Sequence, residues 1–403
     1  MERTHLVVKG IRIAFGNLLI VAIIGCLLRF FFLYPLPGFN YSYMLHAHSH
    51  LALLGWVFMA LFVLIMHAYL PLEATKYQKY IYYFIILQLA NVGMLFTFPF
   101  TGYALWSIIF SAIHALMAML FAWVFILEVD KSITDQHRTS FRFIKWALIL
   151  LFISNLAPFA LGPVSVTQGK TDLYYSLIYF YLHFQYNGWF TFVLLGLLLH
   201  QLEKQGVNTD HKLVKLGFLL KLLAVFPAYL LSVLWTSPGL IWNILGGVAA
   251  ITQLVGLVLI LVFVMRYLSV LFGAHSGVTK MLFFIGAVAV CVQHVLMLLS
   301  AFPTLSDMAF ARNIVIAYLH LVLLGFVTIW IFYQLMYQRV IKVFLLSEMG
   351  VGLFFMAFLA TEFILIFQGM LGSATYWLFI LAILQLCGIA LITASIRKHK
   401  VVA

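Results

Sequence analysis

The sequence predicts an all-α polytopic membrane protein with twelve transmembrane helices, arranged as three pseudo-equivalent arcs of four helices. Apolar residues make up 65% of the 403 residues and charged residues only 8%, a balance that soluble globular domains do not show. Long apolar segments recur along the whole chain, and a histidine motif appears three times at nearly equal intervals. We therefore expect one membrane domain over residues 1–403, built from repeats near 1–140, 141–275 and 276–403.

Twelve apolar segments are each long enough to cross the ~30 Å hydrocarbon core of a bilayer as a helix. Every third of the chain contains four of them. They lie near residues 10–34, 43–70, 78–98, 103–127, 144–162, 173–200, 213–236, 239–265, 281–302, 312–338, 343–370 and 374–396. The lipid bilayer is therefore the expected surrounding of almost the whole chain.

Positive charges give this topology an orientation, because Lys and Arg concentrate in cytoplasmic connections. Twenty of the 23 Lys and Arg residues, Lys221 among them, fall on the side that also carries both ends of the chain. We therefore expect cytoplasmic termini in a bacterial inner membrane. The same distribution explains the net charge of +12, so this charge does not indicate nucleic-acid binding.

The histidine motif occurs once in each third of the chain. A glycine follows the histidine by five residues, and an aromatic residue follows the glycine. The copies are His50 with Gly55 and Trp56, His183 with Gly188 and Trp189, and His320 with Gly325 and Phe326. The histidines are 133 and 137 residues apart, which indicates an internal repeat. The glycine lies about one and a half helical turns beyond the histidine, where it permits close approach of a neighbouring helix or of a flat ring.

Seven histidines fall in the outer half of the predicted bilayer, where imidazole is a functional signal by default. Each is either a metal or haem ligand or a side chain that is hydrogen-bonded within the helix bundle. Because residues four apart share a helix face, His46 and His50 should point the same way and His48 the opposite way. The seven are His46, His48, His50, His114, His183, His294 and His320. We expect the histidines of the cytoplasmic connections, including His137 and His200, to be solvated.

Two arginines lie above this histidine layer, at the outer side of the predicted topology. The guanidinium groups of Arg29 and Arg312 can pair with haem propionates or extend to the lipid headgroups. The three cysteines form no CxxCH pattern, so any haem would be bound noncovalently.

The topology, with histidines on the second, sixth and tenth segments, resembles subunit I of the haem-copper oxidase superfamily, which includes nitric oxide reductases. The string His48-Ser-His50-Leu-Ala-Leu-Leu-Gly-Trp is also similar to a pattern of two histidines, leucine, glycine and tryptophan on the tenth span of that family. The resemblance implies that His50 and His320 are the axial ligands of a haem b. It also implies that His183 is a copper ligand, or part of a second metal or haem position completed from His46, His48, His114 or His294.

The chain departs from the oxidase pattern in two places. Segment 213–236 lacks the histidine pair that completes the copper site of that family, and the tenth segment has one histidine instead of two. In this respect the chain is similar to the short NnrS-type relatives of the superfamily, which are twelve-span chains with histidines but without the full complement of an oxidase. The resemblance therefore implies electron transfer, or an oxidoreductase acting on nitric oxide or dioxygen, with electrons from quinol or a protein donor and with an additional subunit as a further partner.

Two other interpretations belong to different functional classes. The cluster His46, His48 and His50 could admit copper or another divalent ion to a transporter or metal-handling protein. Transporter sites are built from interrupted helices, and no proline visibly interrupts the histidine-bearing segments here, which favours the haem interpretation. The chain could also be a non-catalytic assembly or partner subunit of the same fold, although retention of histidine in all three motifs argues against a complete loss of chemistry.

Overall fold

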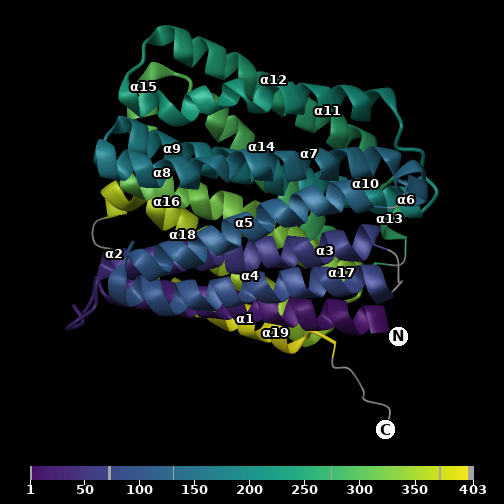
Figure 1. The fold of residues 1–403 in the computed structure, drawn as a ribbon, viewed down its shortest axis with the longest axis horizontal. Coiled ribbons are helices and arrows are strands. Elements are labelled where there is room, and N and C mark those ends of the chain that lie inside the picture. Colours follow the sequence, from purple (N-terminus) through teal and green to yellow (C-terminus); the bar gives the residue numbers. More distant parts are fainter. Residues whose placement is uncertain (1, 71–73, 130, 274, 372–373, 398–403) are drawn as a thin grey trace. The chain divides into compact units, whose positions relative to one another are not determined.

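The computed structural model describes residues 2–70, 74–129, 131–273, 275–371 and 374–397. Every regular element in these ranges is a helix (Figure 1), and the only β contact within them is an isolated bridge between Ile341 and Ile396. Eleven helices among the described residues are long and apolar enough to cross a membrane. The prediction of an all-helical, multi-pass membrane protein is thus confirmed at this level.

The order of the helices repeats along the chain in groups of four. The first helix of each group is α1 (Glu2–Phe30), α7 (Arg138–Ser154) with α8 (Leu156–Thr167), or α14 (Gly277–Leu299). The third is α4 (Ala74–Thr101), α11 (Lys212–Val225) with η3 (Pro227–Thr236), or α18 (Leu345–Leu371). The fourth is α5 (Leu105–Glu128), α12 (Leu240–Met265) or α19 (Thr375–Ala394). Short helices occupy connections: α6 (Lys131–Gln136), α13 (Leu268–Phe272) and α15 (Pro303–Ala309).

The second helix of each group carries the histidine motif and has three parts. These are α2 (Tyr41–His50), η1 (Leu51–Phe58) and α3 (Met59–Tyr69); α9 (Asp172–His183), η2 (Phe184–Phe190) and α10 (Thr191–Lys204); and α16 (Arg312–His320), η4 (Leu321–Thr328) and α17 (Ile329–Tyr337). The helix over Tyr41–Tyr69 is the most enclosed of the eleven, with 83% of its most apolar stretch buried against 22% for Thr375–Ala394. The first copy of the motif therefore sits on an interior helix.

One predicted span is not among the eleven. The segment 173–200 is helical throughout, as α9, η2 and α10. It carries His183, Gln185 and Asn187 within its apolar sequence, and polar side chains of this kind lower the mean hydropathy of a segment. The twelve-helix count therefore stays a prediction.

The middle parts η1, η2 and η4 are π-helices, and each begins directly after the repeated histidine. A π-helix bonds residue i to residue i+5, is rare, and usually marks a functional site. The wider turn also corrects our estimate of the glycine position. Because Gly55 follows His50 by five residues, it lies about one turn beyond the histidine and not one and a half.

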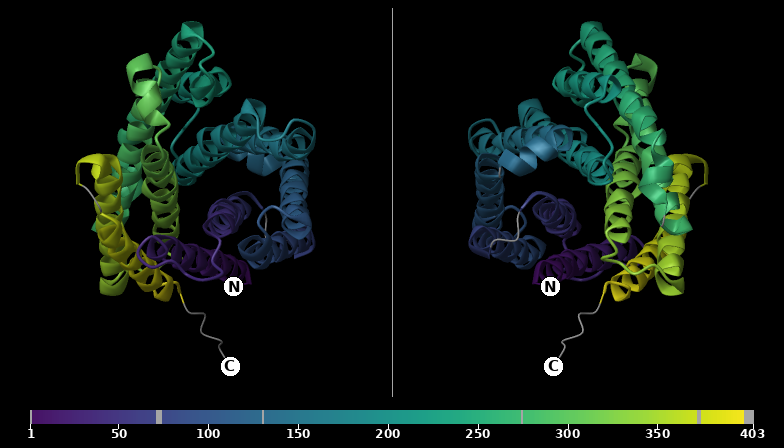
Figure 2. Two further views of the ribbon diagram at one scale, coloured as in Figure 1. Left: turned by 90° about the vertical axis from the view of Figure 1, so that its left-hand side faces the viewer. Right: turned by 90° about the vertical axis from the view of Figure 1, so that its right-hand side faces the viewer.

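The chain forms two compact units. Unit 1 comprises Met1–Phe121, Ser276–Leu282 and Trp330–Ala403, and unit 2 comprises Ala122–His275 and Phe283–Ile329. Within unit 1, α19 packs beside both α1 and α18. In Figure 2, α18 and α19 are yellow and α1 is purple. Within unit 2, α7 packs beside α10, and α11 beside α12.

Facing glycines hold two of these helix pairs close together. A Cβ added to Gly217 would lie 2.6 Å from the carbonyl oxygen of Gly256, and one added to Gly256 would lie 2.8 Å from that of Gly217. Gly350 and Gly388 make the same reciprocal contact between α18 and α19, at 2.9 and 2.8 Å. Close backbone approach through small residues is a common way to associate helices in membranes. The two pairs are offset by 133 and 132 residues, which agrees with the period of the histidine motif.

Candidate functional site

In unit 1, His50 is held by its own helix. Its Nδ1 lies 2.9 Å from the carbonyl oxygen of His46. Because a carbonyl oxygen can only accept, Nδ1 carries the proton, and Nε2 has a lone pair that accepts from the hydroxyl of Tyr103 at 3.2 Å. Imidazole ligands in proteins are commonly oriented in this way, with one nitrogen bonded to a backbone carbonyl and the other facing the metal. His50 is also only half-buried.

The neighbouring histidines point as the helical spacing predicts. The rings of His46 and His50 both pack against Tyr103, with centroids 4.6 and 5.7 Å from it. His48 faces α1, where its Nδ1 lies 3.0 Å from the carbonyl oxygen of Val21. A Cβ on Gly25 would lie 3.2 Å from the His48 ring, so this glycine makes room for the imidazole.

Polar side chains of unit 1 hydrogen-bond the carbonyls of the π-helix η1. Asn17 donates to the carbonyl of Gly55 at 2.8 Å, and Asn91 to that of Leu54 at 3.4 Å. Asn17 and Gln88 also exchange two amide hydrogen bonds, at 2.9 and 3.1 Å. Backbone groups within a membrane must be satisfied inside the protein. We therefore attribute the buried amides of Asn17 and Asn91 to the need to satisfy carbonyls of the π-helix.

The space beside the motif glycine is filled by protein. A Cβ on Gly55 would lie 2.7 Å from Leu51 and 3.3 Å from Asn17, and one on Gly188 would lie 3.1 Å from Leu150. Trp56 is buried against Phe15 and Phe332, with ring centroids 5.0 and 6.0 Å away. For Gly55 and Gly188, ordinary helix packing therefore accounts for the glycine, and no flat ring is required.

The other predicted residues of unit 1 occupy separate places. His114, on α5, is buried and packs edge-on against Phe58 of η1, with ring centroids 5.0 Å apart. Arg29 lies in the last turn of α1. In unit 2, Arg312 is exposed at the start of α16, and His320 ends that helix. These positions do not distinguish propionate binding from contact with headgroups.

In unit 2, both ring nitrogens of His183 are engaged by the protein. Nε2 lies 2.7 Å from the carbonyl oxygen of Val225, so this nitrogen carries the proton. Nδ1 then accepts from the side-chain amide of Asn187 at 3.1 Å. The oxygen of Asn187 accepts in turn from Gln293 of α14 at 2.8 Å. His183 itself is fully buried.

A proline explains why a side chain bonds Val225. Pro227 has no N–H to donate, so regular α-helical bonding stops in the turn that contains Val225 and the chain continues as the 3-10 helix η3. His183 thus bonds a carbonyl at a break in a neighbouring helix. A second break has the same cause, since Pro158 would clash with the carbonyl of Ser154, and α7 ends there. The hydroxyl of Ser154 accepts from Gln185 of η2 at 2.9 Å.

The second histidine of unit 2 contacts a buried lysine. Nδ1 of His294 lies 2.8 Å from the carbonyl oxygen of Val290 and is therefore protonated. Its Nε2 accepts from Nζ of Lys221 at 2.9 Å, and Lys221 also donates to Gln253 at 3.3 Å. Lys221 is fully buried within α11. Lys221 therefore does not lie in a cytoplasmic connection, although the sequence analysis counts it among the cations that orient the topology.

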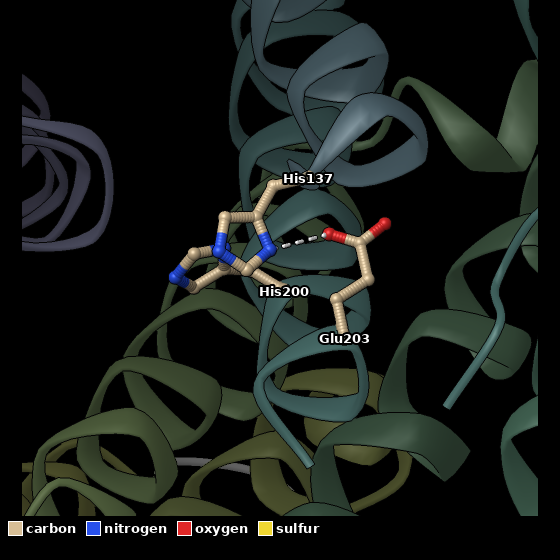
Figure 3. A group of neighbouring side chains, drawn as sticks. All are labelled: His137, His200 and Glu203. Carbon is tan, nitrogen blue, oxygen red and sulfur yellow. Dashed lines mark ion pairs between the residues drawn. The ribbon is translucent and has the colours of Figure 1, made fainter. Parts of the chain in front are cut away.

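A further histidine pair also contradicts the sequence expectation. His137 and His200, expected to be solvated, are 8% and 5% exposed. They lie beside Glu203, and one ligand atom from each of the three residues falls within 4.8 Å of the others. Figure 3 shows the His137 ring directed at the Glu203 carboxylate, with the His200 ring beside it. The sequence did contain a sign of this group, because His200 and Glu203 are three residues apart and therefore share a helix face. It was missed because both histidines were assigned to cytoplasmic connections.

Comparison with known proteins gives no assignment. No family model matches the chain, and no curated protein matches it. The candidate groups therefore have to be weighed on their own chemistry.

Proposed function

We propose that this chain is a membrane haem protein of the oxidase subunit I type, in which His50 is an axial ligand of a haem b. One observation carries the proposal: in all three copies of the motif, the histidine is followed at once by a rare π-helix. Because π-helical segments often occur at functional sites, the same distortion next to each repeated histidine supports a common role of these positions in holding a ligand. The resemblance, and not the geometry, assigns His320 as the second axial ligand.

The surroundings of His50 fit a haem ligand. Nδ1 is fixed by the carbonyl of His46, so the lone pair of Nε2 points away from its own helix. That lone pair accepts from the hydroxyl of Tyr103, a half-exposed side chain that a haem can displace. From Leu51 onward the helix is almost entirely buried, which excludes water from one side. A bound haem would supply one-electron transfer or binding of a diatomic gas.

The surroundings of His183 and His294 do not fit a copper site. Both nitrogens of each imidazole already have protein partners. One partner is Lys221, which occupies Nε2 of His294 and, in its charged form, would repel a cation. We therefore propose no copper at these residues, and we expect electron transfer or gas binding in preference to reduction of dioxygen at a haem-copper pair. Quinol or a protein donor would supply the electrons, in a bacterial inner membrane and with cytoplasmic termini.

Spectroscopy of the purified protein tests the proposal. We expect a b-type reduced-minus-oxidised spectrum and a pyridine haemochrome with about one haem per chain. His50→Ala and His320→Ala should each abolish or shift this spectrum, whereas His211→Ala, a change at the N-terminus of α11, should leave it intact. A spectrum unchanged in His50→Ala would refute the assignment of that ligand.

The competing functions give different outcomes in the same experiment. Colourless protein that retains copper, and loses it in His46→Ala or His48→Ala, would favour the metal-handling interpretation. The contact of both His46 and His50 with Tyr103 gives that interpretation a local basis. Colourless and metal-free protein would favour an assembly subunit.

A further inference from the structure

The second group of interest lies in unit 2, where the N-terminus of α7 meets the last turn of α10. His137 precedes α7 as its N-cap residue. His200 and Glu203 lie three residues apart in α10 and therefore on one face of that helix. A metal-binding pair with i, i+3 spacing of a carboxylate and an imidazole is well known from helical bundles. None of these residues belongs to the histidine motif.

The contact between His137 and Glu203 has the spacing of two metal ligands. Nδ1 of His137 lies 3.3 Å from Oε2 of Glu203, whereas a charge-assisted hydrogen bond between such groups is about 2.7–2.9 Å long. Among the described residues, this buried Nδ1 has no hydrogen-bond partner. Nitrogen and oxygen ligands on a tetrahedral zinc ion, at bonds of about 2.0–2.2 Å, lie about 3.3–3.5 Å apart. The observed distance of 3.3 Å between Nδ1 and Oε2 matches this distance between two ligands.

The Glu203 carboxylate is held in place before any ion binds. The Ser140 N–H donates to Oε1 at 3.0 Å, and the hydroxyls of Ser140 and Thr209 donate to Oε2 and Oε1. Hydrogen bonds of this kind to a metal-ligating carboxylate fix its orientation and raise its affinity. The side chains of His137 and Glu203 are only 10% and 7% exposed. The group is thus rigid and largely dry.

Helix capping explains part of this arrangement. Glu203 accepts from the backbone of Ser140, the third residue of α7, so its charge also stabilises that helix N-terminus. Capping requires the carboxylate alone. It does not explain why a second buried imidazole, that of His200, lies beside that of His137, with ring centroids 4.3 Å apart.

We propose that His137, His200 and Glu203 bind a divalent transition-metal ion through two imidazole nitrogens and one carboxylate oxygen. This donor set suits zinc or iron(II) and leaves further coordination positions for water or an exogenous ligand. The site is independent of the proposed haem, because it shares no residue with it. It would link α7 to α10 in unit 2.

Zinc binding to the full-length protein tests this site. Detergent-purified protein is treated with a chelator, reloaded with Zn²⁺ and desalted, and zinc and iron are then measured separately by elemental analysis. We expect about one retained zinc per chain in the wild type. His200→Ala should weaken zinc binding by at least about tenfold, while His211→Ala should bind zinc like the wild type. Equal retention by wild type and His200→Ala would overturn the proposal.

A spectroscopic readout guards against variants that fail to fold. Co²⁺ added in place of zinc should give the d–d absorption of a four- or five-coordinate site in the wild type. Glu203→Gln should lose that absorption, whereas Thr209→Val should keep it but weaken metal affinity by about tenfold, because it removes only an outer hydrogen bond. Absorption typical of hexa-aqua Co²⁺ in wild-type protein would also overturn the proposal. Because the readouts are zinc and cobalt, a negative haem spectrum does not affect them.

Discussion

His50 and His183 occupy the same position in two copies of one motif, yet their imidazoles have different surroundings. Each ends an α-helix and precedes a π-helix. The half-buried His50 offers a nitrogen that accepts from the partly exposed Tyr103, whereas the fully buried His183 bonds Val225 of a neighbouring helix through one nitrogen and the Asn187 side chain through the other. The backbone distortion is therefore common to the repeats, and the side chains around it decide whether the histidine can act as a ligand.

The residue four positions after the histidine accounts for much of this difference. It is Asn187 in the second motif and Leu54 in the first. Asn187 takes up Nδ1 of His183 and passes a hydrogen bond on to Gln293. The side chain of Leu54 cannot bond an imidazole, and Nδ1 of His50 instead bonds the carbonyl of His46. This difference between the repeats accounts for the bond to Nδ1 of His183, while the Val225 carbonyl accounts for the bond to its Nε2.

The largest expected effect is on stability. His183→Leu would leave the Val225 carbonyl and the Asn187 amide without their partner in a buried, apolar setting, at a cost of about 1–3 kcal/mol for each unsatisfied group. His50→Leu should cost about 1 kcal/mol or less, because its partners are partly exposed. Thermal unfolding of haem-free preparations in one detergent compares the two. Equal losses of stability would contradict the distinction between the two histidines.

Sequence reasoning predicted the repeated positions but not their roles. The recurrence of His50, His183 and His320 can be read directly, and so can the membrane character of the chain. The π-helices could not be predicted, because the apolar pattern was interpreted with the period of an α-helix; the five-residue spacing from histidine to glycine was the only trace of them. The hydrogen bond from Gln293 to Asn187 joins residues 106 positions apart, and only the fold brings them together.

Depth counted along predicted spans was the weaker guide. It placed Lys221 in a connection, although this lysine lies inside α11 and bonds His294. It also placed His137 and His200 in solvent, although both are buried beside Glu203. In each case the residue lies within a turn or two of a predicted end, where boundaries are least certain and where helix packing, rather than composition, decides exposure.

An intermediate effect on stability is expected when the hydrogen bond from Asn187 to His183 is removed and the imidazole is kept. Asn187→Leu gives the second motif the residue found in the first. Nδ1 of His183 and the amide of Gln293 would each lose a partner, at about 1–3 kcal/mol for each group, but the bond from His183 to the Val225 carbonyl would remain. The reverse change, Leu54→Asn, places an amide near His50 that can compete with the His46 carbonyl, and it should lower haem content if His50 is a ligand. Haem content unaffected by Leu54→Asn would argue that this position does not control availability.

The smallest expected effect on stability, and the most direct test of availability, comes from Tyr103→Phe. Tyr103 is 46% exposed, and a hydrogen bond of an exposed side chain contributes about 1 kcal/mol or less, so the protein should unfold at nearly the wild-type temperature. The change nevertheless removes the hydroxyl that donates to Nε2 of His50. Diethyl pyrocarbonate, followed by peptide mass spectrometry, should therefore modify His50 faster in Tyr103→Phe than in the wild type, and should modify His183 in neither. Rapid modification of His183 in folded wild-type protein would mean that its hydrogen bonds open readily, and the contrast between the two motifs would then be one of degree.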